Sequence, residues 1–125
     1  MAVTVEEELS GVELSANEQV HLQQIVREAL ANIEKHAQAR RASVRLARGE
    51  GRQIELAVED DGIGLNSEES PRHHFGLSIM RDRARLLGGE LDVGSRTGGG
   101  TRVALRFEAA KTFGSKQPVV ADAGE

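Results

Sequence analysis

Apolar residues recur at helical spacing between residues 15 and 37 of the chain. Their separations of three and four residues place them on one stripe, which predicts an amphipathic helix running to about Ala37. Ser15 followed by Glu18 has the spacing of a capping box, so the helix is expected to begin just after Ser15. The stripe expected to face the core consists of Leu22, Val26, Ala29, Leu30, Ile33 and Ala37.

Alternation of apolar and polar residues predicts strands before and after this helix. Val3 and Val5 alternate with polar residues in the acidic first stretch, which predicts a short strand there. Residues 42–46 and 54–58 alternate in the same way on either side of the turn Gly49-Glu50-Gly51. Because the connection is short, these two strands should form an antiparallel hairpin.

The second half of the chain predicts one more helix and one more hairpin. Apolar residues from Leu77 to Leu87 have helical spacing, and Gly88-Gly89 is expected to end that helix. Residues 91–93 and 103–107 alternate on either side of Gly98-Gly99-Gly100. This pattern predicts a second antiparallel pair joined by a glycine-rich loop.

Together these elements predict an α+β fold, a two-layer α/β sandwich with helices on one face of a mixed, mostly antiparallel sheet. We expect one domain over residues 1–110 and a flexible tail over residues 111–125. Residues 66–74 are polar, contain a proline and lack a clear period. They are expected to form a mobile loop or lid.

Composition excludes several classes of function. The net charge of −4 does not favour nucleic-acid binding, and the arginines between residues 40 and 52 are better explained as a charged strand edge. The absence of cysteine excludes disulfides, thiolate metal sites and cysteine nucleophiles. No apolar run approaches the roughly 20 residues that span a bilayer, so we expect no direct membrane contact by this stretch.

The polar face of the first helix carries an unusual set of side chains. At about 100° per residue, Glu28, Asn32, Lys35 and His36 share one stripe. A carboxylate, an amide oxygen and two potential cations together suit Mg²⁺ and a polyphosphate. An ordinary solvated helix face has the same pattern, so the stripe alone does not decide between the two.

A second candidate site follows the strand that ends near residue 60. The sequence there is Asp60-Asp61-Gly62-Ile63-Gly64. An aspartate at a strand exit can accept a hydrogen bond from an exocyclic amine, while the glycines let the backbone approach a flat ring. Taken by itself, the motif is also that of a simple Asp-Gly turn.

Two further motifs are rich in glycine. Gly76-Leu77 at the expected start of the second helix would offer backbone N–H groups and a positive dipole end to phosphates. Gly100-Thr101 closes a loop that is either a plain hairpin turn or a shelf beside a nucleotide. His73 and His74 are expected to face solvent, because no partner with metal-ligand spacing accompanies them.

The order and spacing of these four motifs resemble the ATP-binding domain of sensor histidine kinases. That domain has the Bergerat-type fold of the gyrase, chaperone, histidine-kinase and mismatch-repair ATPase superfamily, and the likeness covers residues 14–107. Residues 21–32, 35–39, 74–84 and 111–113 are similar to the nitrate/nitrite sensor branch of these kinases.

The resemblance implies a role for each polar residue. Asn32 would coordinate Mg²⁺ through its amide oxygen, and Glu28 would hold a metal-bound water or assist as a general base. Lys35 and His36 would meet phosphate oxygens. Asp60 would accept a hydrogen bond from the adenine N6 amine, so ATP would be preferred over GTP.

The remaining residues that the resemblance assigns to the nucleotide are Gly62 and Gly64 beside the base, Gly76 and Leu77 at the phosphate-facing helix, and Gly100 and Thr101 at the adenine side. Two positions depart from the family pattern. Asp61 stands where asparagine is more usual and is expected to add a negative charge near the pocket. Ile79 stands where many relatives have a second glycine.

The resemblance also implies partners and a location. The γ-phosphoryl group would go to a histidine on a separate dimerisation domain of the same protein, then to an aspartate on a response regulator. His21 is followed by Leu22 and lacks the sequence context of such an acceptor histidine. The chain would be the cytoplasmic part of an inner-membrane-anchored sensor. An anti-sigma-factor-type serine kinase and a nucleotide-responsive binding module without turnover stay open as alternatives.

Overall fold

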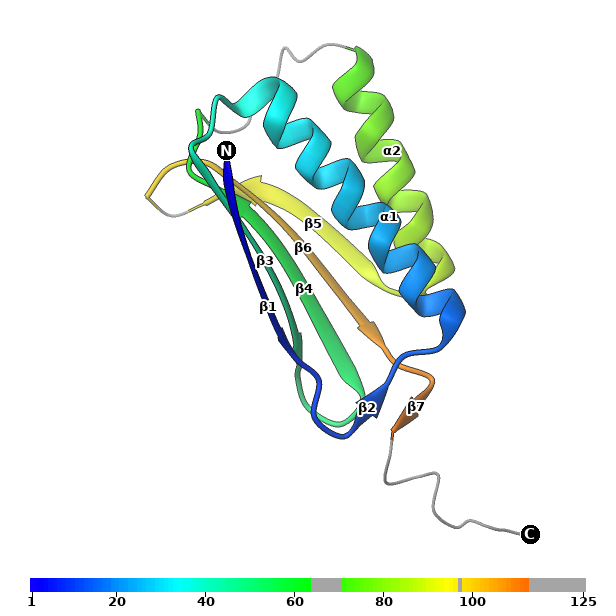
Figure 1. Cartoon of the computed structure of the whole chain (residues 1–125). Coiled ribbons are helices and arrows are strands. Elements are labelled where there is room, and N and C mark those ends of the chain that lie inside the picture. The colour runs from blue at the N-terminus through cyan, green and yellow to red at the C-terminus, as the bar shows by residue number, and fades with distance from the viewer. Residues whose placement is uncertain (64–70, 97, 113–125) are drawn as a thin grey trace, which may run out of the picture.

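The computed structural model of this chain describes residues 1–63, 71–96 and 98–112. Two helices cover one face of a twisted sheet, which confirms the predicted two-layer α+β architecture (Figure 1). The elements are β1 (Ala2–Glu8), β2 (Val12–Glu13), α1 (Ala16–Asn32), the π-helix η1 (Ile33–Ala37), β3 (Arg41–Arg48), β4 (Gln53–Asp60), α2 (Pro71–Leu86), β5 (Glu90–Ser95), β6 (Thr101–Glu108) and β7 (Lys111–Thr112).

The main sheet has five strands in the order β1-β3-β4-β6-β5. Both predicted hairpins are present, because β3 pairs antiparallel with β4 and β5 pairs antiparallel with β6. The expectation that the arginine-rich strand forms a sheet edge is wrong. The parallel partner β1 covers β3, and Glu6 of β1 lies 3.7 Å from the guanidinium of Arg45.

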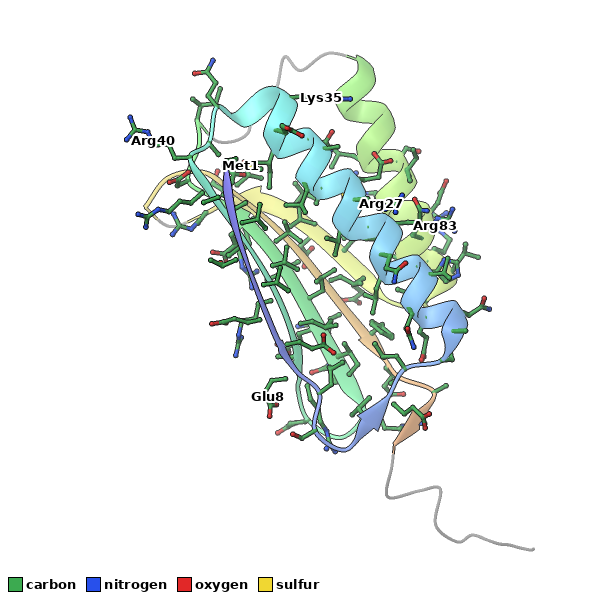
Figure 2. The ribbon with its side chains drawn as sticks, viewed as in Figure 1. Met1, Glu8, Arg27, Lys35, Arg40 and Arg83 are labelled. Atoms are coloured by element: carbon green, nitrogen blue, oxygen red, sulfur yellow. The ribbon has the colours of Figure 1, made fainter. Side chains whose placement is uncertain are left out.

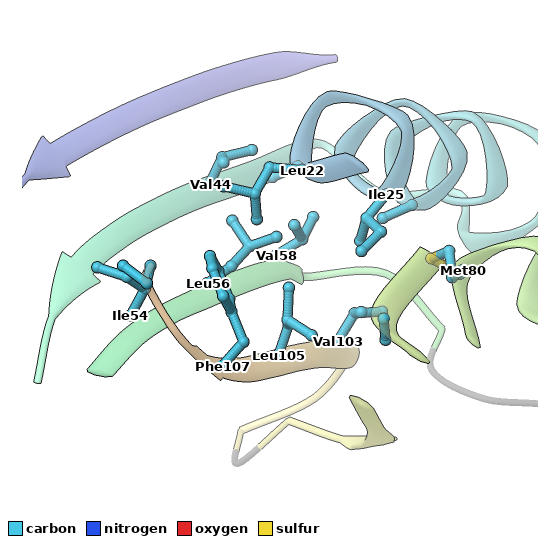
Figure 3. Packing of buried hydrophobic residues seen from close by; sticks show 14 of the residues in the cluster. Leu22, Ile25, Val44, Ile54, Leu56, Val58, Met80, Val103, Leu105 and Phe107 are labelled. Atoms are coloured by element: carbon cyan, nitrogen blue, oxygen red, sulfur yellow. The ribbon is translucent and has the colours of Figure 1, made fainter. Parts of the chain in front are cut away.

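The core lies between the sheet and the two helices (Figure 3). Leu56 pairs in register with Leu46 on one side and Leu105 on the other, so all three side chains share the face toward the helices. Ile25 of α1 is 0% exposed and Met80 of α2 is 1% exposed. Burying each such side chain stabilises the fold by about 1.5–3 kcal/mol, so the helices are held against the sheet by apolar packing.

The predicted capping box begins α1. Ser15 Oγ accepts a hydrogen bond from the Glu18 backbone at 3.1 Å, and Glu18 Oε1 accepts one from the Ser15 backbone at 2.8 Å. The helical region reaches Ala37 as expected, but from Ile33 it is a π-helix. Gln38 then ends it in a left-handed conformation with φ of 53°. Single π-turns are frequent at functional sites.

The start of α2 corrects one expectation. Gly76 does not open the helix, because α2 begins at Pro71. Proline suits the first helical position, where its missing N–H would have no partner. Residues 71–74 of the expected loop are therefore helical, and residues 66–70 lie outside the described residues.

A second, two-stranded sheet joins the segment before α1 to the segment after β6. Val12 of β2 pairs antiparallel with Thr112 of β7. Regular pairing thus extends into residues 111–112, and residues 113–125 lie outside the part of the chain that the structure describes. The domain boundary at residue 110 stays a prediction. Among the described helices, none combines the length and the apolar character needed to cross a membrane.

Candidate functional site

Asp60 is a buried acid at the end of β4. Alternation along the strand puts its side chain on the helix-facing side with Val58, and the residue is 2% exposed. Asp60 Oδ1 accepts a hydrogen bond of 2.7 Å from the backbone N–H of Gly62. Asp60 Oδ2 is buried and has no partner among the described residues. Leaving a buried acceptor unsatisfied costs about 1–3 kcal/mol, so this oxygen is suited to receive a donor from a ligand.

Gly100 lies against the backbone of Asp60. A Cβ atom on this glycine would overlap the carbonyl oxygen of Asp60 and come within 3.1 Å of the Cα of Asp61. Gly100 also has a φ of 101°, which side chains rarely adopt. The fold therefore brings together Asp60, Gly62 and Gly100, and Thr101 follows directly as the first residue of β6. Gly64 lies outside the described residues.

Asp61, expected to add a negative charge near the pocket, has its carboxylate turned toward the start of β3. Asp61 Oδ1 accepts hydrogen bonds from the backbone N–H groups of Arg40 at 2.9 Å and Arg41 at 3.0 Å. The hydrogen bond from Arg41, followed by that from Arg40, holds the pKa of Asp61 below its ordinary value. Asp61 thus ties the connection after η1 to the end of β4.

Glu59 points to the opposite face of the sheet from Asp60. Its two carboxylate oxygens accept hydrogen bonds from Arg96 at 3.2 Å and Arg102 at 2.8 Å. Three consecutive acids at this strand end therefore have three different surroundings. Neither Glu59 nor Arg96 was among the predicted site residues. Two features of the sequence indicate these residues. Strand alternation places Glu59 on the face opposite Asp60, and Arg96 stands just before the glycine-rich loop.

A second cluster forms where α1 meets α2. Asn32 is the last residue of α1, and its Nδ2 atom is buried without a partner among the described residues. A Cβ atom on Gly76 of α2 would lie 3.0 Å from Asn32 Nδ2, 3.1 Å from Asn32 Oδ1 and 3.3 Å from Glu28 Oε1. Glu28 and Asn32 therefore direct oxygen atoms to one region, and Gly76 allows the helices to approach there.

Other predicted residues lie next to this cluster. Leu77 follows Gly76 and packs against the core. Lys35 lies in η1 and is exposed (Figure 2). His36 also belongs to η1, but its side chain lies outside the described part of the structure.

The donor set of this cluster fits magnesium bound together with phosphate. Mg²⁺ prefers oxygen ligands and is usually held by one or two protein groups plus water and phosphate oxygens. The amide of Asn32 and the carboxylate of Glu28 are donors of this kind. No group of three or more His, Asp or Glu side chains able to hold a metal occurs within the described residues. One amide and one carboxylate leave coordination positions for phosphate oxygens and water, so Asn32 and Glu28 suit a metal carried by a nucleotide.

Comparison with known proteins agrees with this geometry. Residues 17–111 match the family described as "Histidine kinase-, DNA gyrase B-, and HSP90-like ATPase". The nitrate/nitrite sensor protein NarQ of Escherichia coli (strain K12) is 39% identical over 109 residues, which cover 87% of this chain and 19% of NarQ. The nitrate/nitrite sensor protein NarX of the same strain is 42% identical over 98 residues, 78% of this chain and 16% of NarX.

Solved structures show the same arrangement. The blue-light activated histidine kinase of Erythrobacter litoralis EL346 superposes with a TM-score of 0.69 at 26% identity, covering 86% of this chain and 38% of that protein. The ATP binding domain of PrrB from Mycobacterium tuberculosis shares the fold, with a TM-score of 0.63 at 24% identity, covering 86% of this chain and 82% of that one. This chain belongs to the family of histidine kinase-, DNA gyrase B- and HSP90-like ATPases.

Proposed function

We propose that this chain is the ATP-binding catalytic domain of a two-component sensor histidine kinase. The observation that carries the proposal concerns buried polar atoms. Among the described residues, the buried side-chain nitrogen and oxygen atoms without a partner are Asn32 Nδ2 and Asp60 Oδ2. Both belong to residues that sequence motifs assign to a nucleotide. Buried polar groups are normally satisfied, so these two residues are suited to hold a ligand at two ends of one site.

Each end of the site has its own chemistry. Asp60 accepts a hydrogen bond from the exocyclic amine of adenine, and guanine presents a carbonyl at that position and is disfavoured. Glu28 and Asn32 supply oxygen atoms for a metal, and Lys35 and His36 meet phosphate oxygens. Mg²⁺, when bound, neutralises negative charge on the phosphates. The contribution of the chain is to hold the γ-phosphoryl group in the orientation that transfer requires.

The acceptor of the phosphoryl group lies on another domain in this proposal. His21 of α1 is half-buried, and its Nδ1 atom lies 3.3 Å from the guanidinium of Arg83 on α2. His21 thus contacts the neighbouring helix and is only partly accessible, so it is unsuited to accept the phosphoryl group. A histidine of the dimerisation domain receives the phosphoryl group, and an aspartate of a response regulator receives it next.

The stimulus is proposed from the relatives. Both NarQ and NarX are named as nitrate/nitrite sensor proteins, and this chain spans less than a fifth of their lengths. We propose a role in nitrate/nitrite-responsive signalling, on the cytoplasmic side of a sensor anchored in the inner membrane.

The test is phosphotransfer from radiolabelled Mg-ATP in the presence of the dimerisation domain of the same protein. Labelling of that domain on histidine is expected, together with tighter ATP binding when Mg²⁺ is present. Labelling of a partner protein on serine would favour the anti-sigma-factor-type kinase instead. Binding of ATP without any transfer would favour a nucleotide-responsive module, and absence of ATP binding would refute all three.

A further inference from the structure

Arg96 connects the glycine-rich loop of the β5–β6 hairpin to the strand that carries Asp60. Its Nη1 atom donates to the carbonyl oxygen of Gly99 at 3.0 Å, and its backbone N–H donates to the carbonyl oxygen of Gly100 at 3.0 Å. Its Nε atom donates to Glu59 Oε1 at 3.2 Å. The Arg96 side chain therefore forms hydrogen bonds to both the loop and β4.

The residue that Arg96 contacts, Glu59, is the chain neighbour of a residue in the candidate site. Glu59 immediately precedes Asp60 in β4. Gly100 touches the Asp60 carbonyl so closely that no side chain fits between them. A displacement of the loop would therefore displace either Gly100 or the backbone of Asp60.

We propose that Arg96 is a positioning residue for the adenine end of the nucleotide site. It acts from the opposite face of the sheet and keeps Gly100 seated against Asp60. The inference rests on the proposed function, since it assumes that Asp60 and Gly100 line the base. Arginine suits this task because its planar fork can hold a carboxylate and a carbonyl oxygen at once.

Arg102 provides a matched comparison in the same cluster. Its Nε atom donates to the other oxygen of Glu59 at 2.8 Å, a shorter contact than that of Arg96. Arg102 lies in β6, and among the described contacts its side chain bonds to Glu59 alone. The two arginine side chains are 38% and 49% exposed, and partly exposed ion pairs contribute little to stability. Removing either side chain should leave the fold intact, but of the two only the Arg96 side chain contacts the loop.

The experiment compares Arg96→Ala with Arg102→Ala in this chain. ADP and GDP dissociation constants are measured by titration calorimetry, and the Tm is measured without nucleotide. Arg96→Ala is expected to raise the Kd of ADP about fivefold, the equivalent of about one ordinary hydrogen bond, because the loop loses its side-chain contact to β4, and to reduce the preference for ADP over GDP. Arg102→Ala is expected to change the Kd of ADP by less than about twofold, since an exposed pair is worth little.

Equal losses in the two variants, or parallel losses for ADP and GDP, would overturn the positioning role. If Arg96→Ala does not fold, Arg96→Lys takes its place. Lysine can pair with Glu59 but has no second nitrogen to donate to the Gly99 carbonyl oxygen. We therefore expect Arg96→Lys to lose part of the ADP affinity that Arg96→Ala loses. An ADP affinity equal to that of wild type would overturn the inference. Failure of the wild-type chain to bind ADP would refute the proposed function as well. If the wild-type chain binds ADP and the Arg96 variants bind it with the same Kd, this inference alone is refuted.

Discussion

Gly100 and Asp60 meet backbone to backbone: a Cβ atom on the glycine would overlap the carbonyl oxygen of the aspartate. The β5–β6 hairpin therefore packs directly on the end of β4, with no side chain between them. This contact explains why glycine is required at position 100 for two separate reasons, its backbone conformation and its lack of a side chain.

Gly98 allows these two reasons to be separated. Gly98 has a φ of 91°, similar to the 101° of Gly100, but a Cβ atom there would meet nothing within 4 Å. Gly98→Ala should cost about 1–3 kcal/mol of unfolding free energy from backbone strain alone. Gly100→Ala should cost more and should also weaken ADP binding. Urea unfolding and calorimetry measure both quantities, and equal effects of the two substitutions would contradict the close contact.

Asp60→Asn should reduce adenine nucleotide affinity by roughly 1–3 kcal/mol, because an acceptor for the base amine is replaced by a donor. Asp61→Asn is the matched control on the adjacent residue. Its amide oxygen can still accept from the backbone of Arg40 and Arg41, so ADP affinity should stay within about twofold of wild type. A Kd of ADP that is unchanged in Asp60→Asn would remove that residue from the site.

Asn32→Asp should abolish Mg²⁺-dependent ATP binding or phosphotransfer. The substitution adds a charge one turn from Glu28 and alters the ligand of a cation that tolerates little variation. Gln23→Glu adds the same charge on an exposed position of the same helix and serves as control. The measurement is the Kd of ATP with and without Mg²⁺. Wild-type phosphotransfer by Asn32→Asp would show that Asn32 is not a ligand.

Gly76→Ala should weaken Mg-ATP binding without a matching loss in the free energy of unfolding. Alanine in a helix interior is favoured over glycine by about 1 kcal/mol, and this gain offsets crowding against Asn32 and Glu28. The free energy of unfolding should therefore change little, while the Kd of Mg-ATP rises as the two polar side chains are pushed aside. Ser78→Ala, at an exposed position of the same helix, should leave the Kd unchanged. Unchanged Mg-ATP affinity in Gly76→Ala would argue against a site at this helix contact.

Asp61 should contribute a pH-dependent part of the stability. Its pKa is lower in the folded protein than the ordinary value of 3.8, so the folded state binds its proton less tightly than the unfolded state. The contribution is fully present above that value and is lost as the pH falls through the lower, folded pKa. In urea unfolding at a series of pH values, wild type should exceed Asp61→Asn in stability at neutral pH. The difference should shrink below pH 3.8, and a constant difference would contradict the hydrogen bonds to β3.

Local patterns in the sequence are sufficient to predict much of this fold. The capping box at Ser15 and Glu18 involves neighbours in the chain, and both hairpins are joined by short turns, so alternation and turn residues specify them. Asp60 follows from the same reasoning, since it ends an alternating strand.

Features that depend on distant contacts were not predictable in this way. The parallel pairing of β1 with β3 joins segments separated by all of α1. The orientation of Asp61 depends on where the backbone of Arg40 and Arg41 lies, and the alternation of β4 does not contain that information. The first turns of α2 lack an apolar period, so only the proline at position 71 indicates its start.

The two ends of the site belong to different layers of the molecule. Asn32 is carried by α1 and Asp60 by the sheet, and the buried contacts of residues such as Ile25 and Val58 determine how far along the strands the helix lies. One helical turn advances about 5.4 Å, so a slide of even part of a turn would change the distance between Asn32 and Asp60. Under the proposed function, interior side chains that lie outside the site would thus set the spacing between its two ends.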